Sequence, residues 1–437
     1  MIIKNVSSLG KTLQRRQALA ILEAGYQAIG MQAVLRSQIA RKGSALFVQG
    51  ERIDLRAFRR IGVIGIGKCA LEAGQYLERI LGQRLWGGMV LDVKQGRTRV
   101  LKSLAGTHPL PSEKNRQASE RIVRFAKSLD PETDLLICVV SGGGSSLFMD
   151  PDGISCDHMT ALTRDLHDSG ATIQELNCVR KHLSSVQGGK FARMLYPLPI
   201  VALYFSDVVS ETSDRNLRTI ASGPLYPDDK TNSDARRILA KYGLWTKHRN
   251  HIRRWSETVK EHRYFSTIRN FLLLTNQTML DAMYEKAARL GLRPAVLTNA
   301  FSGRSDSAFS RIKILAGKKP GRGIYLAAGE TTVRVRGTGE GGRNQESCLA
   351  ALKSLKPGEL FVSAASDGRD NTDHAGAIAD NETVLRAKKL GLDARAFLGR
   401  NDSYHFFSKT KDFIRTGLIG SNVSDVMIYM KTQNRPM

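Results

Sequence analysis

The sequence predicts an α/β protein with two α/β domains, of which the N-terminal one is a Rossmann-like, doubly wound sheet. Three observations support this prediction. The chain of 437 residues is long enough for two domains of ordinary size. Apolar, strand-like runs alternate with amphipathic, helix-like runs, as they do in a largely parallel sheet. Two of the apolar runs also end in glycine-rich turns, at residues 65–70 and 141–146.

The first half of the chain contains the strand and glycine pattern twice. Residues 59–81 have the pattern of a buried strand, a glycine turn and an amphipathic helix, and residues 134–148 repeat the strand and the glycines. We expect the other elements of this half at these positions: strands at 87–92, 99–105 and 200–206, and helices near 113–129, 158–169 and 174–195. In such sheets ligands collect where strands end and glycine loops begin.

A polar and basic stretch, residues 228–266, separates the two halves, and we interpret it as a helical connection between domains. The alternation then restarts. We expect strands at 269–276 and 294–299, a helix at 277–291, two β segments within 321–337 that meet near Gly329, and a strand followed by an acidic loop within 358–380. The predicted domains are residues 1–235, which are Rossmann-like, and residues 236–437, with the active site in the cleft between them.

The composition is that of an ordinary globular protein, with 41% hydrophobic and 24% charged residues. No stretch approaches the roughly 18 consecutive apolar residues that a membrane helix needs, so we expect no membrane span. The basic, amphipathic residues 1–30 leave an organelle transit peptide open, but a first helix of the folded domain is the simpler interpretation. Five scattered cysteines without CxxC spacing favour a reducing compartment, and we predict a cytoplasmic protein.

The charge balance is unusual, because 66 Lys and Arg residues face 41 Asp and Glu residues and give a net charge of +25. Such a charge suits nucleic acid or anionic small molecules as partners. The basic residues occur along the entire chain, without the interleaved aromatic residues of a single-strand platform. Nucleic-acid binding therefore stays the less favoured alternative.

Two glycine turns in the first half carry the first candidate site residues. One of them consists of Ser141, Gly142, Gly143, Gly144, Ser145 and Ser146. Three consecutive glycines cost chain entropy, which makes sense if backbone N–H groups must approach an oxyanion or a phosphate, although a plain tight turn is the alternative. In the other turn Lys68 could hold an anion together with helix amides. Neither the GxGxxG fingerprint nor a P-loop is present.

Polar residues follow in two further places of the first half. Asn177, Arg180 and Lys181 lie on neighbouring turns of a predicted helix, and that edge could face a carboxylate or phosphate, or simply solvent. Asp207 comes directly after an apolar strand, which suits a magnesium ligand or an acceptor for a hydroxyl group. His108 and His182 are interpreted as structural or substrate-contacting residues rather than catalytic bases.

The second half adds oxygen-rich clusters in a glycine-rich setting. The candidates are Glu330, Arg343 and Asn344, which follow glycines, and Asp367 and Asp370 in one acidic loop. Carboxylate ligands favour Mg²⁺, a hard cation that shares phosphate oxygens, over zinc. Neither HExxH nor an evident Ser-His-Asp set is present.

The order of these motifs resembles one family, the glycerate 2-kinases with their DUF4147 and MOFRL domains. The resemblance extends from about residue 15 to residue 430. It is carried by "GIGKCA", "GTHPLPSEKN", "SGGGSS", "ELNCVRKHLSSVQGGK", "SDVV", "IASGP", "AAGETTV", "GEGGRNQE", "SDGRD", "HAGAI", "NDSY" and "TGLIGSNVSDV". Three segments depart from the family pattern: "SETSD" after "SDVV", the short acidic loop "DNTD", and "TGLIGSNVSD" near the C-terminus.

The resemblance implies ATP- and Mg²⁺-dependent phosphorylation of D-glycerate at the 2-hydroxyl, giving 2-phosphoglycerate. It implies that Lys68 and Arg343 are catalytic, together with Asp367 or Asp370 of the "SDGRD" loop. We expect Asp207 and Asp367 as metal ligands, and the serine-glycine turn with Arg180 around the substrate carboxylate or the nucleotide phosphates. The alternatives are an NAD(P)H-dependent hydroxypyruvate reductase, a name some family members carry, and a basic RNA-binding protein on the same fold. A homodimer is left open.

Overall fold

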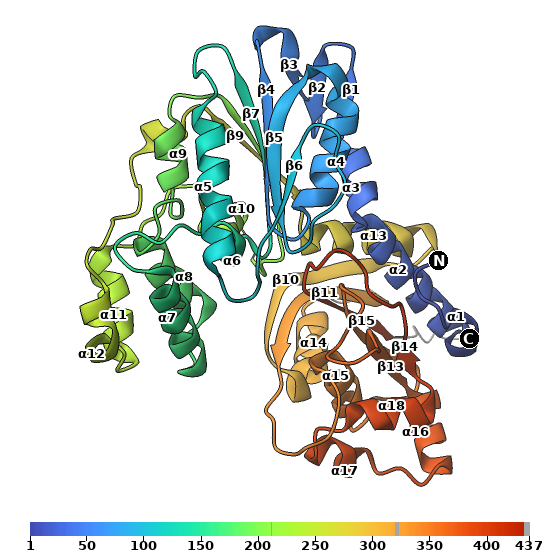
Figure 1. The fold of residues 1–437 in the computed structure, drawn as a ribbon. Coiled ribbons are helices and arrows are strands. Elements are labelled where there is room, and N and C mark those ends of the chain that lie inside the picture. The colour runs from blue at the N-terminus through green and yellow to red at the C-terminus, as the bar shows by residue number, and fades with distance from the viewer. Residues whose placement is uncertain (211, 320–322, 432–437) are drawn as a thin grey trace. The chain divides into compact units, whose positions relative to one another are not determined.

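A computed structural model of the chain describes residues 1–210, 212–319 and 323–431 (Figure 1). The chain forms two compact units. Unit 1 comprises Met1–Ala33 together with the chain from Leu274 onward, and the short segment at 209–210. Unit 2 comprises Val34–Val208 and Thr212–Leu273. Each unit has its own six-stranded sheet.

The sheet of unit 2 has the strand order β6-β5-β4-β7-β8-β9. Its strands are β4 (Ile61–Ile66), β5 (Leu85–Asp92), β6 (Lys102–Ala105), β7 (Leu135–Ser141), β8 (Ile200–Phe205) and β9 (Ile268–Leu274). Every neighbouring pair from β6 to β8 is parallel. Numbered along the chain, the order is 3-2-1-4-5-6, that of a doubly wound sheet. The predicted α/β class is confirmed.

The apolar runs of β4, β7 and β8 are buried along their whole length, because helices cover both faces of this sheet (Figure 1). Alternate residues of one face, such as Ile64 and Ile66, share a core cluster with α5 and α9. The helices are α3 (Met31–Gln38), α4 (Ala70–Leu81), α5 (Glu113–Lys127), α6 (Gly144–Leu147), α7 (Cys156–Asp168), α8 (Ile173–His182), α9 (Lys190–Leu195), α10 (Ser213–Thr219), α11 (Asn232–Lys241) and α12 (Trp245–His248). A small antiparallel sheet lies between α3 and β4 in the chain and is formed by β1 (Ile39–Lys42), β2 (Ala45–Val48) and β3 (Glu51–Asp54).

Two expectations for this part of the chain were wrong. Residues 174–195 form two helices rather than one: α8 ends at His182, and α9 begins only after Gly189, whose φ of +77° is left-handed. Residues 228–266 are not a connection between domains. Their helix α11 packs its Ala235 and Leu239 into a core cluster with α8, and the chain then continues into β9 of the same sheet.

The sheet of unit 1 has the order β10-β11-β15-β12-β13-β14. Its strands are β10 (Pro294–Arg304), β11 (Ile324–Thr332), β12 (Glu359–Ala365), β13 (Gly376–Asp380), β14 (Phe413–Ile414) and β15 (Asp425–Lys431). Only β10 and β11 run parallel, and the remaining described pairs are antiparallel. The helices are α1 (Val6–Leu9), α2 (Leu13–Ala28), α13 (Asn276–Arg289), α14 (Ala308–Gly317), α15 (Arg343–Ala351), α16 (Asn381–Lys389), α17 (Ala394–Gly399) and α18 (Ser403–Thr410).

The stretch predicted as two β segments forms one strand, β11, that continues through Gly329. Residues 321 and 322 of that prediction lie outside the described residues. Gly329 is paired with Phe301 of β10 at a φ of +149°, and a Cβ atom there would lie 2.0 Å from the Phe301 carbonyl oxygen. The glycine therefore allows two backbones to come close rather than separating two strands.

The N-terminal helix α2 is a helix of the folded protein, as predicted, but it packs in unit 1 beside α13 (Figure 1). Arg15 of α2 is fully buried and pairs with Asp380 at 2.6 Å and with Asp412 at 2.7 Å. The compact units therefore differ from the predicted division at residues 235 and 236. No single described helix is long and apolar enough to cross a membrane, although α2 and α3 together pass that test as a bent pair.

We expect Arg15→Ala to destabilise unit 1 by about 3–5 kcal/mol, because it leaves the buried Asp380 without its cation and leaves the buried Asp412 with Arg386 alone. Arg16→Ala is the matched control, since Arg16 is exposed on the same helix and should change the free energy of unfolding by less than about 0.5 kcal/mol. Urea unfolding measures the difference. It is followed by circular dichroism rather than by tryptophan fluorescence, because all three tryptophans lie in unit 2 and would not report on unit 1. Equal transitions for both variants would contradict the role of Arg15.

Candidate functional site

The two glycine turns of the first half meet at one edge of the unit 2 sheet. They follow the carboxyl ends of β4 and β7, the neighbouring strands at which the strand order reverses and beside which ligands bind in such sheets. The Lys68 backbone N–H donates to the Gly142 carbonyl at 2.9 Å, and the Ser141 hydroxyl donates to the Ile66 carbonyl at 3.2 Å. Gly67 has a φ of +114°, and a Cβ atom there would lie 2.2 Å from Ser141 Oγ.

A cavity of about 480 Å³ opens beside this edge within unit 2. Seven of the predicted site residues line it: Gly142, Gly143, Ser145, Ser146, Asn177, Arg180 and Asp207. Ser141 lies beneath the cavity, where its hydroxyl joins the two turns, and Gly144 begins α6. The fold therefore brings predicted site residues from three separate segments of the chain together at one cavity.

Lys68 and His108 lie beside Gly143, which has a φ of +81°. A Cβ atom at Gly143 would lie 3.0 Å from Lys68 Cγ and 3.3 Å from His108 Cδ2, so the missing side chain leaves room for both residues. Partial burial and the charges of Lys68 and Arg180 lower the pKa of His108. Both effects favour the uncharged imidazole.

A strained turn fixes the far wall of the cavity. Ala221 and Ser222 of the short 3₁₀ turn Ile220–Ser222 adopt positive φ values of 51° and 61°. The Ser222 hydroxyl lies 2.9 Å from Ser145 Oγ and 3.2 Å from Asn177 Oδ1. Backbone strain of this kind persists only where the surroundings enforce it, and it is concentrated at functional sites. Asn177 thus lines the cavity and also holds the turn.

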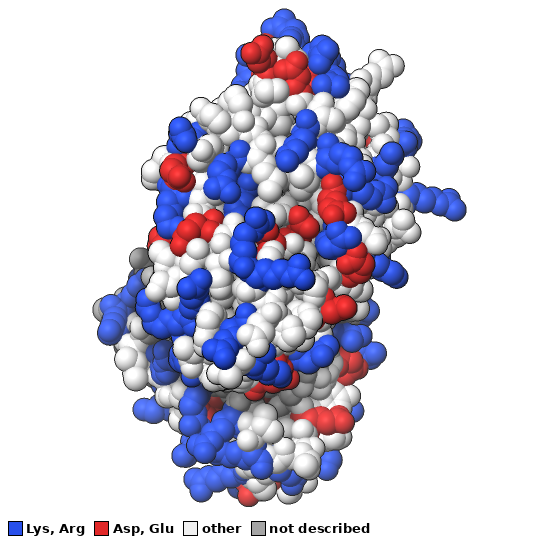
Figure 2. All heavy atoms as spheres, turned by 60° about the vertical axis from the view of Figure 1, so that its left-hand side comes forward, with Lys and Arg blue, Asp and Glu red and all other residues white. Residues whose placement is uncertain are grey.

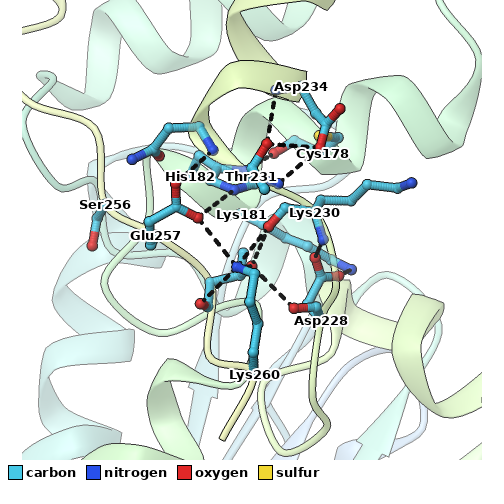
Figure 3. A network of polar contacts seen from close by, with 12 residues as sticks. Cys178, Lys181, His182, Asp228, Lys230, Thr231, Asp234, Ser256, Glu257 and Lys260 are labelled. Atoms are coloured by element: carbon cyan, nitrogen blue, oxygen red, sulfur yellow. Dashed lines mark hydrogen bonds and ion pairs between the residues drawn. The ribbon is translucent and has the colours of Figure 1, made fainter.

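Arg180 and Lys181 are sequence neighbours in α8 but have different surroundings. Arg180 lines the cavity, and its Nη2 donates to Ser146 Oγ at 2.9 Å. Lys181 donates to the Arg218 carbonyl at 3.0 Å and forms an ion pair with Asp228. Figure 3 shows Lys181 beside Asp228 in a polar network that is not part of the cavity lining. The structure therefore does not bring Lys181 to the predicted substrate site.

The network around Lys181 fixes the C-terminal end of α8. Lys260 donates to the Lys230 carbonyl at 2.9 Å and to Glu257 at 3.2 Å (Figure 3). The buried Lys190 donates to three carbonyl oxygens, of Lys181, Ser184 and Ser256, at 2.7–3.0 Å. Burial lowers the pKa of Lys190 to about 7. The bonds from Lys190 and Lys181 hold the last turn of α8, which also carries Arg180.

The remaining predicted residues lie around a second pocket, of about 530 Å³, within unit 1. Arg343 is the first residue of α15 and forms a bidentate ion pair with Asp425, with Nε to Oδ2 at 2.5 Å and Nη2 to Oδ1 at 3.2 Å. Its Nη2 also donates to Glu330 Oε1 at 3.0 Å. Glu330 and Arg343, both predicted as site residues, therefore lie together, and Arg343 also binds a second carboxylate that the prediction missed.

Asp425 is that missed residue. It is the first residue of β15 and is 1% exposed. Burial raises the pKa of Asp425 to about 7, although the charge of Arg343 opposes the increase. The available signal was the acidic residue of "NVSDV", which stands immediately before an apolar strand, as Asp207 stands immediately after one.

Asp367 and Asp370 occupy different environments in the same acidic loop. Asp370 is buried and accepts hydrogen bonds from the backbone N–H groups of Asn344 and Gln345, at 3.0 and 2.7 Å, and from both side chains. It thereby caps the first turn of α15. Asn344 is buried and bonded on both ends, to Asp370 and Ser363. Asp367 is half-buried on the pocket wall, where it accepts from the Arg369 backbone N–H at 3.0 Å.

The carboxylates fit a magnesium ion that is shared with phosphates rather than a closed protein cage. Within residues 1–210, 212–319 and 323–431, no three His, Cys, Asp or Glu side chains gather in a way that could hold a metal ion. Mg²⁺ is usually bound by one or two carboxylates together with water and substrate phosphates. Asp207, which lies against Gly142, and Asp367 each offer one such carboxylate at a pocket wall. Glu211 of the divergent "SETSD" segment lies outside the described residues.

The chain matches two protein families. Residues 17–257 match a domain of unknown function, DUF4147, and residues 323–425 match the MOFRL family. A D-glycerate 2-kinase from Thermotoga maritima is 34% identical over 84% of this chain and 90% of its own length. A crystal structure of a glycerate kinase from the same organism superposes with a TM-score of 0.82 at 31% identity, covering 95% of this chain and 99% of that one. A protein from Agrobacterium vitis named putative hydroxypyruvate reductase is 33% identical over 84% of this chain and 98% of its own length.

A doubly wound sheet with two glycine turns and a cavity at its switch point defines an α/β protein of the class that binds ligands at this edge of the sheet. The matched families and relatives narrow this class. The chain belongs to the glycerate 2-kinase family.

Because Asp370 caps α15, we expect Asp370→Ala to lower the free energy of unfolding by about 1–3 kcal/mol, leaving two backbone N–H groups without an acceptor. Asp367→Ala is the matched control from the same loop. It removes a half-buried side chain and should change the free energy of unfolding by less than about 0.5 kcal/mol. Denaturant unfolding in the absence of substrates compares the free energies of unfolding of the two variants. A loss for Asp367→Ala as large as for Asp370→Ala would show that the two residues share a structural role.

Proposed function

We propose that the protein is a D-glycerate 2-kinase that transfers the γ-phosphoryl group of ATP to the 2-hydroxyl of D-glycerate with the help of Mg²⁺. The observation that carries the proposal is the meeting of Lys68 and the serine-glycine turn at the switch point of a doubly wound sheet. The T. maritima relative adds the acceptor and the position of transfer.

Phosphoryl transfer requires little covalent chemistry from the protein, which acts by positioning groups and neutralising charge. We assign the Lys68 ammonium and the N–H groups of the serine-glycine turn to phosphate oxygens. The bonds to Asp425 and Glu330 use Nε and Nη2 of Arg343 and fix the guanidinium plane. We assign the N–H groups of its Nη1 to the transferring phosphoryl group.

The carboxylates take the remaining roles. We assign Asp367 to the metal or to the reacting hydroxyl, because Asp370 already uses both of its oxygens to cap α15. Asp207 is the corresponding carboxylate of unit 2. A bound Mg²⁺ would neutralise charge on the β- and γ-phosphates.

We expect Lys68→Ala and Arg343→Ala each to lower kcat by about 10²-fold or more, because each removes a charge that is more strongly needed in the transition state than in the ground state. Arg336→Ala is the control for Arg343, since Arg336 is an exposed arginine of the loop before α15. Steady-state kinetics and circular dichroism of all three variants separate catalysis from folding. Activity of Arg343→Ala near that of Arg336→Ala would remove Arg343 from the mechanism.

The direct test of the function combines purified protein, D-glycerate, ATP and Mg²⁺, with ADP release as the rate measurement. Phosphorus NMR identifies the product, and we expect 2-phosphoglycerate. Formation of 3-phosphoglycerate would refute the assigned hydroxyl, and an absence of ADP release at millimolar D-glycerate would refute the acceptor.

Hydroxypyruvate reductase is the second candidate, because the A. vitis relative carries that name. The chain has no GxGxxG fingerprint for the pyrophosphate of a dinucleotide. We therefore expect no oxidation of NADH or NADPH with hydroxypyruvate under conditions in which the kinase assay gives turnover.

Nucleic-acid binding as the main function has less support. On the face drawn in Figure 2, Lys and Arg side chains are spread over the surface with Asp and Glu between them, rather than gathered into one stripe. Many of these side chains form surface ion pairs, such as Lys241 with Glu175 and Arg254 with Asp152. A nucleic-acid site would be expected to concentrate unpaired basic residues along one track.

A further inference from the structure

Four Lys or Arg side chains are buried among the described residues: Arg15, Arg180, Lys181 and Lys190. Three of them have partners that compensate for their charge. Arg15 pairs with two carboxylates, Lys181 pairs with Asp228, and Lys190 donates to three carbonyl oxygens. Arg180 is different.

Arg180 is 5% exposed, and its contact with Ser146 Oγ is a bond to a neutral group. Its Nε is buried without a hydrogen-bond partner, and no carboxylate of the described chain lies within 4.0 Å of its guanidinium. Burial accordingly lowers the pKa of Arg180 to about 10. Because a buried charge is costly unless it is paired, this arrangement indicates that the partner of Arg180 is a ligand.

The guanidinium is held in place at the wall of the 480 Å³ cavity, a volume typical of sites for small molecules. Ser146 Oγ accepts the bond from Arg180 Nη2 and in turn donates to the Pro109 carbonyl. This chain of bonds orients the guanidinium before any ligand arrives. The lysine network at the end of α8, described above, fixes the helix that carries it.

The other lining residues define what kind of ligand fits. The apolar ones include Leu110, Leu176, Val208 and Ile220. A partly apolar wall strengthens an ion pair with Arg180, because fewer water dipoles screen it. Asp207 also lines the cavity, and a carboxylate accepts hydrogen bonds from hydroxyl groups but repels anions. The cavity thus suits a ligand with one anionic end and at least one hydroxyl group.

A carboxylate matches Arg180 better than a phosphate does. The planar guanidinium pairs with both oxygens of a carboxylate, whose single negative charge equals its own positive charge. A phosphate monoester carries close to two negative charges and would leave an excess charge in a cavity that also holds Asp207. The exposed Lys68 and the glycine N–H groups are available to phosphates instead.

We propose that Arg180 is the receptor for the carboxylate of the acceptor substrate and that this cavity selects small hydroxycarboxylates. The assignment of the ligand as the acceptor rests on the proposed kinase function. The pairing of Arg180 with a carboxylate is independent of turnover, so it can be measured without nucleotide.

The test uses Arg180→Met and Arg180→Lys, with Arg121→Met as the matched control. Arg121 is an exposed arginine of α5, in the same unit, and is not among the residues that line the cavity. Calorimetry measures the binding of D-glycerate, of its neutral amide glyceramide, and of inorganic phosphate to each protein without ATP. Steady-state kinetics then gives KM for D-glycerate and for ATP separately.

We expect the wild type to bind D-glycerate and to discriminate against glyceramide. Arg180→Met should bind D-glycerate about 30-fold or more weakly and lose the discrimination, because a charge-assisted bidentate pair is lost. Arg180→Lys keeps the positive charge but lacks the parallel N–H donors of a guanidinium. Its affinity for D-glycerate should therefore lie between that of the wild type and that of Arg180→Met. KM for ATP should change less than about twofold in every variant, and Arg121→Met should resemble the wild type.

Three outcomes would overturn the proposal. Unchanged D-glycerate affinity in Arg180→Met is one, and a selective loss of ATP or phosphate binding in that variant is another. The third is a wild type that binds phosphate in the cavity but neither D-glycerate, glycolate nor D-lactate. Wild-type binding of a hydroxycarboxylate without any ADP release would instead refute the proposed kinase function and leave this inference standing.

A stability measurement separates the ligand role from a structural one. If Arg180 awaits a ligand, Arg180→Met removes an uncompensated buried charge and should raise the Tm of the substrate-free protein by about 2–4 °C. It should also abolish the further rise that D-glycerate gives to the wild type. A lower Tm in Arg180→Met, with D-glycerate still stabilising the protein, would assign Arg180 to the fold and overturn the proposal.

Discussion

The unit 2 site depends on one constraint, the close approach of the two backbones that leave β4 and β7. The Lys68 N–H bonds to the Gly142 carbonyl, and a Cβ atom at Gly67 would overlap Ser141. A side chain is therefore excluded at Gly67, where the two backbones approach each other. The positions of Lys68, His108 and the serine hydroxyls follow from this approach, because all of them border the same glycines.

In unit 1 a buried carboxylate has the corresponding role. Asp370 caps the first turn of α15, and this fixes the helix start at which Arg343 stands. Asp425 and Glu330 then orient the guanidinium. The glycines of "GEGG" permit the approach, since a Cβ atom at Gly342 would lie 2.2 Å from Asp370 Oδ1. The loop that looks flexible in the sequence is thus held by acidic residues more than 25 positions away.

Local patterns predicted the strands of the unit 2 sheet, both glycine turns and seven of the residues that line the cavity, because periodicity and chain reversals are set by neighbouring residues. Partners distant in the chain could not be predicted in the same way. Nothing near Arg15 indicates its pairing with Asp380 and Asp412, which places the first helix in unit 1. Asp425 was missed for the same reason, since its partner Arg343 is 82 residues away.

Arg180 and Lys181 have the same place in the sequence pattern but different packing neighbours. Two cations adjacent on a helix point about 100° apart, so they have different neighbours although the sequence presents them as one basic edge. Lys181 forms an ion pair with Asp228, 47 residues further along the chain, and so has a structural role. Arg180 lines the cavity and donates a hydrogen bond to the Ser146 hydroxyl group. Among the four buried cations of the described chain, Arg180 is the one that has a single hydroxyl partner and a buried Nε without a partner, and this difference depends on packing that the sequence pattern does not show.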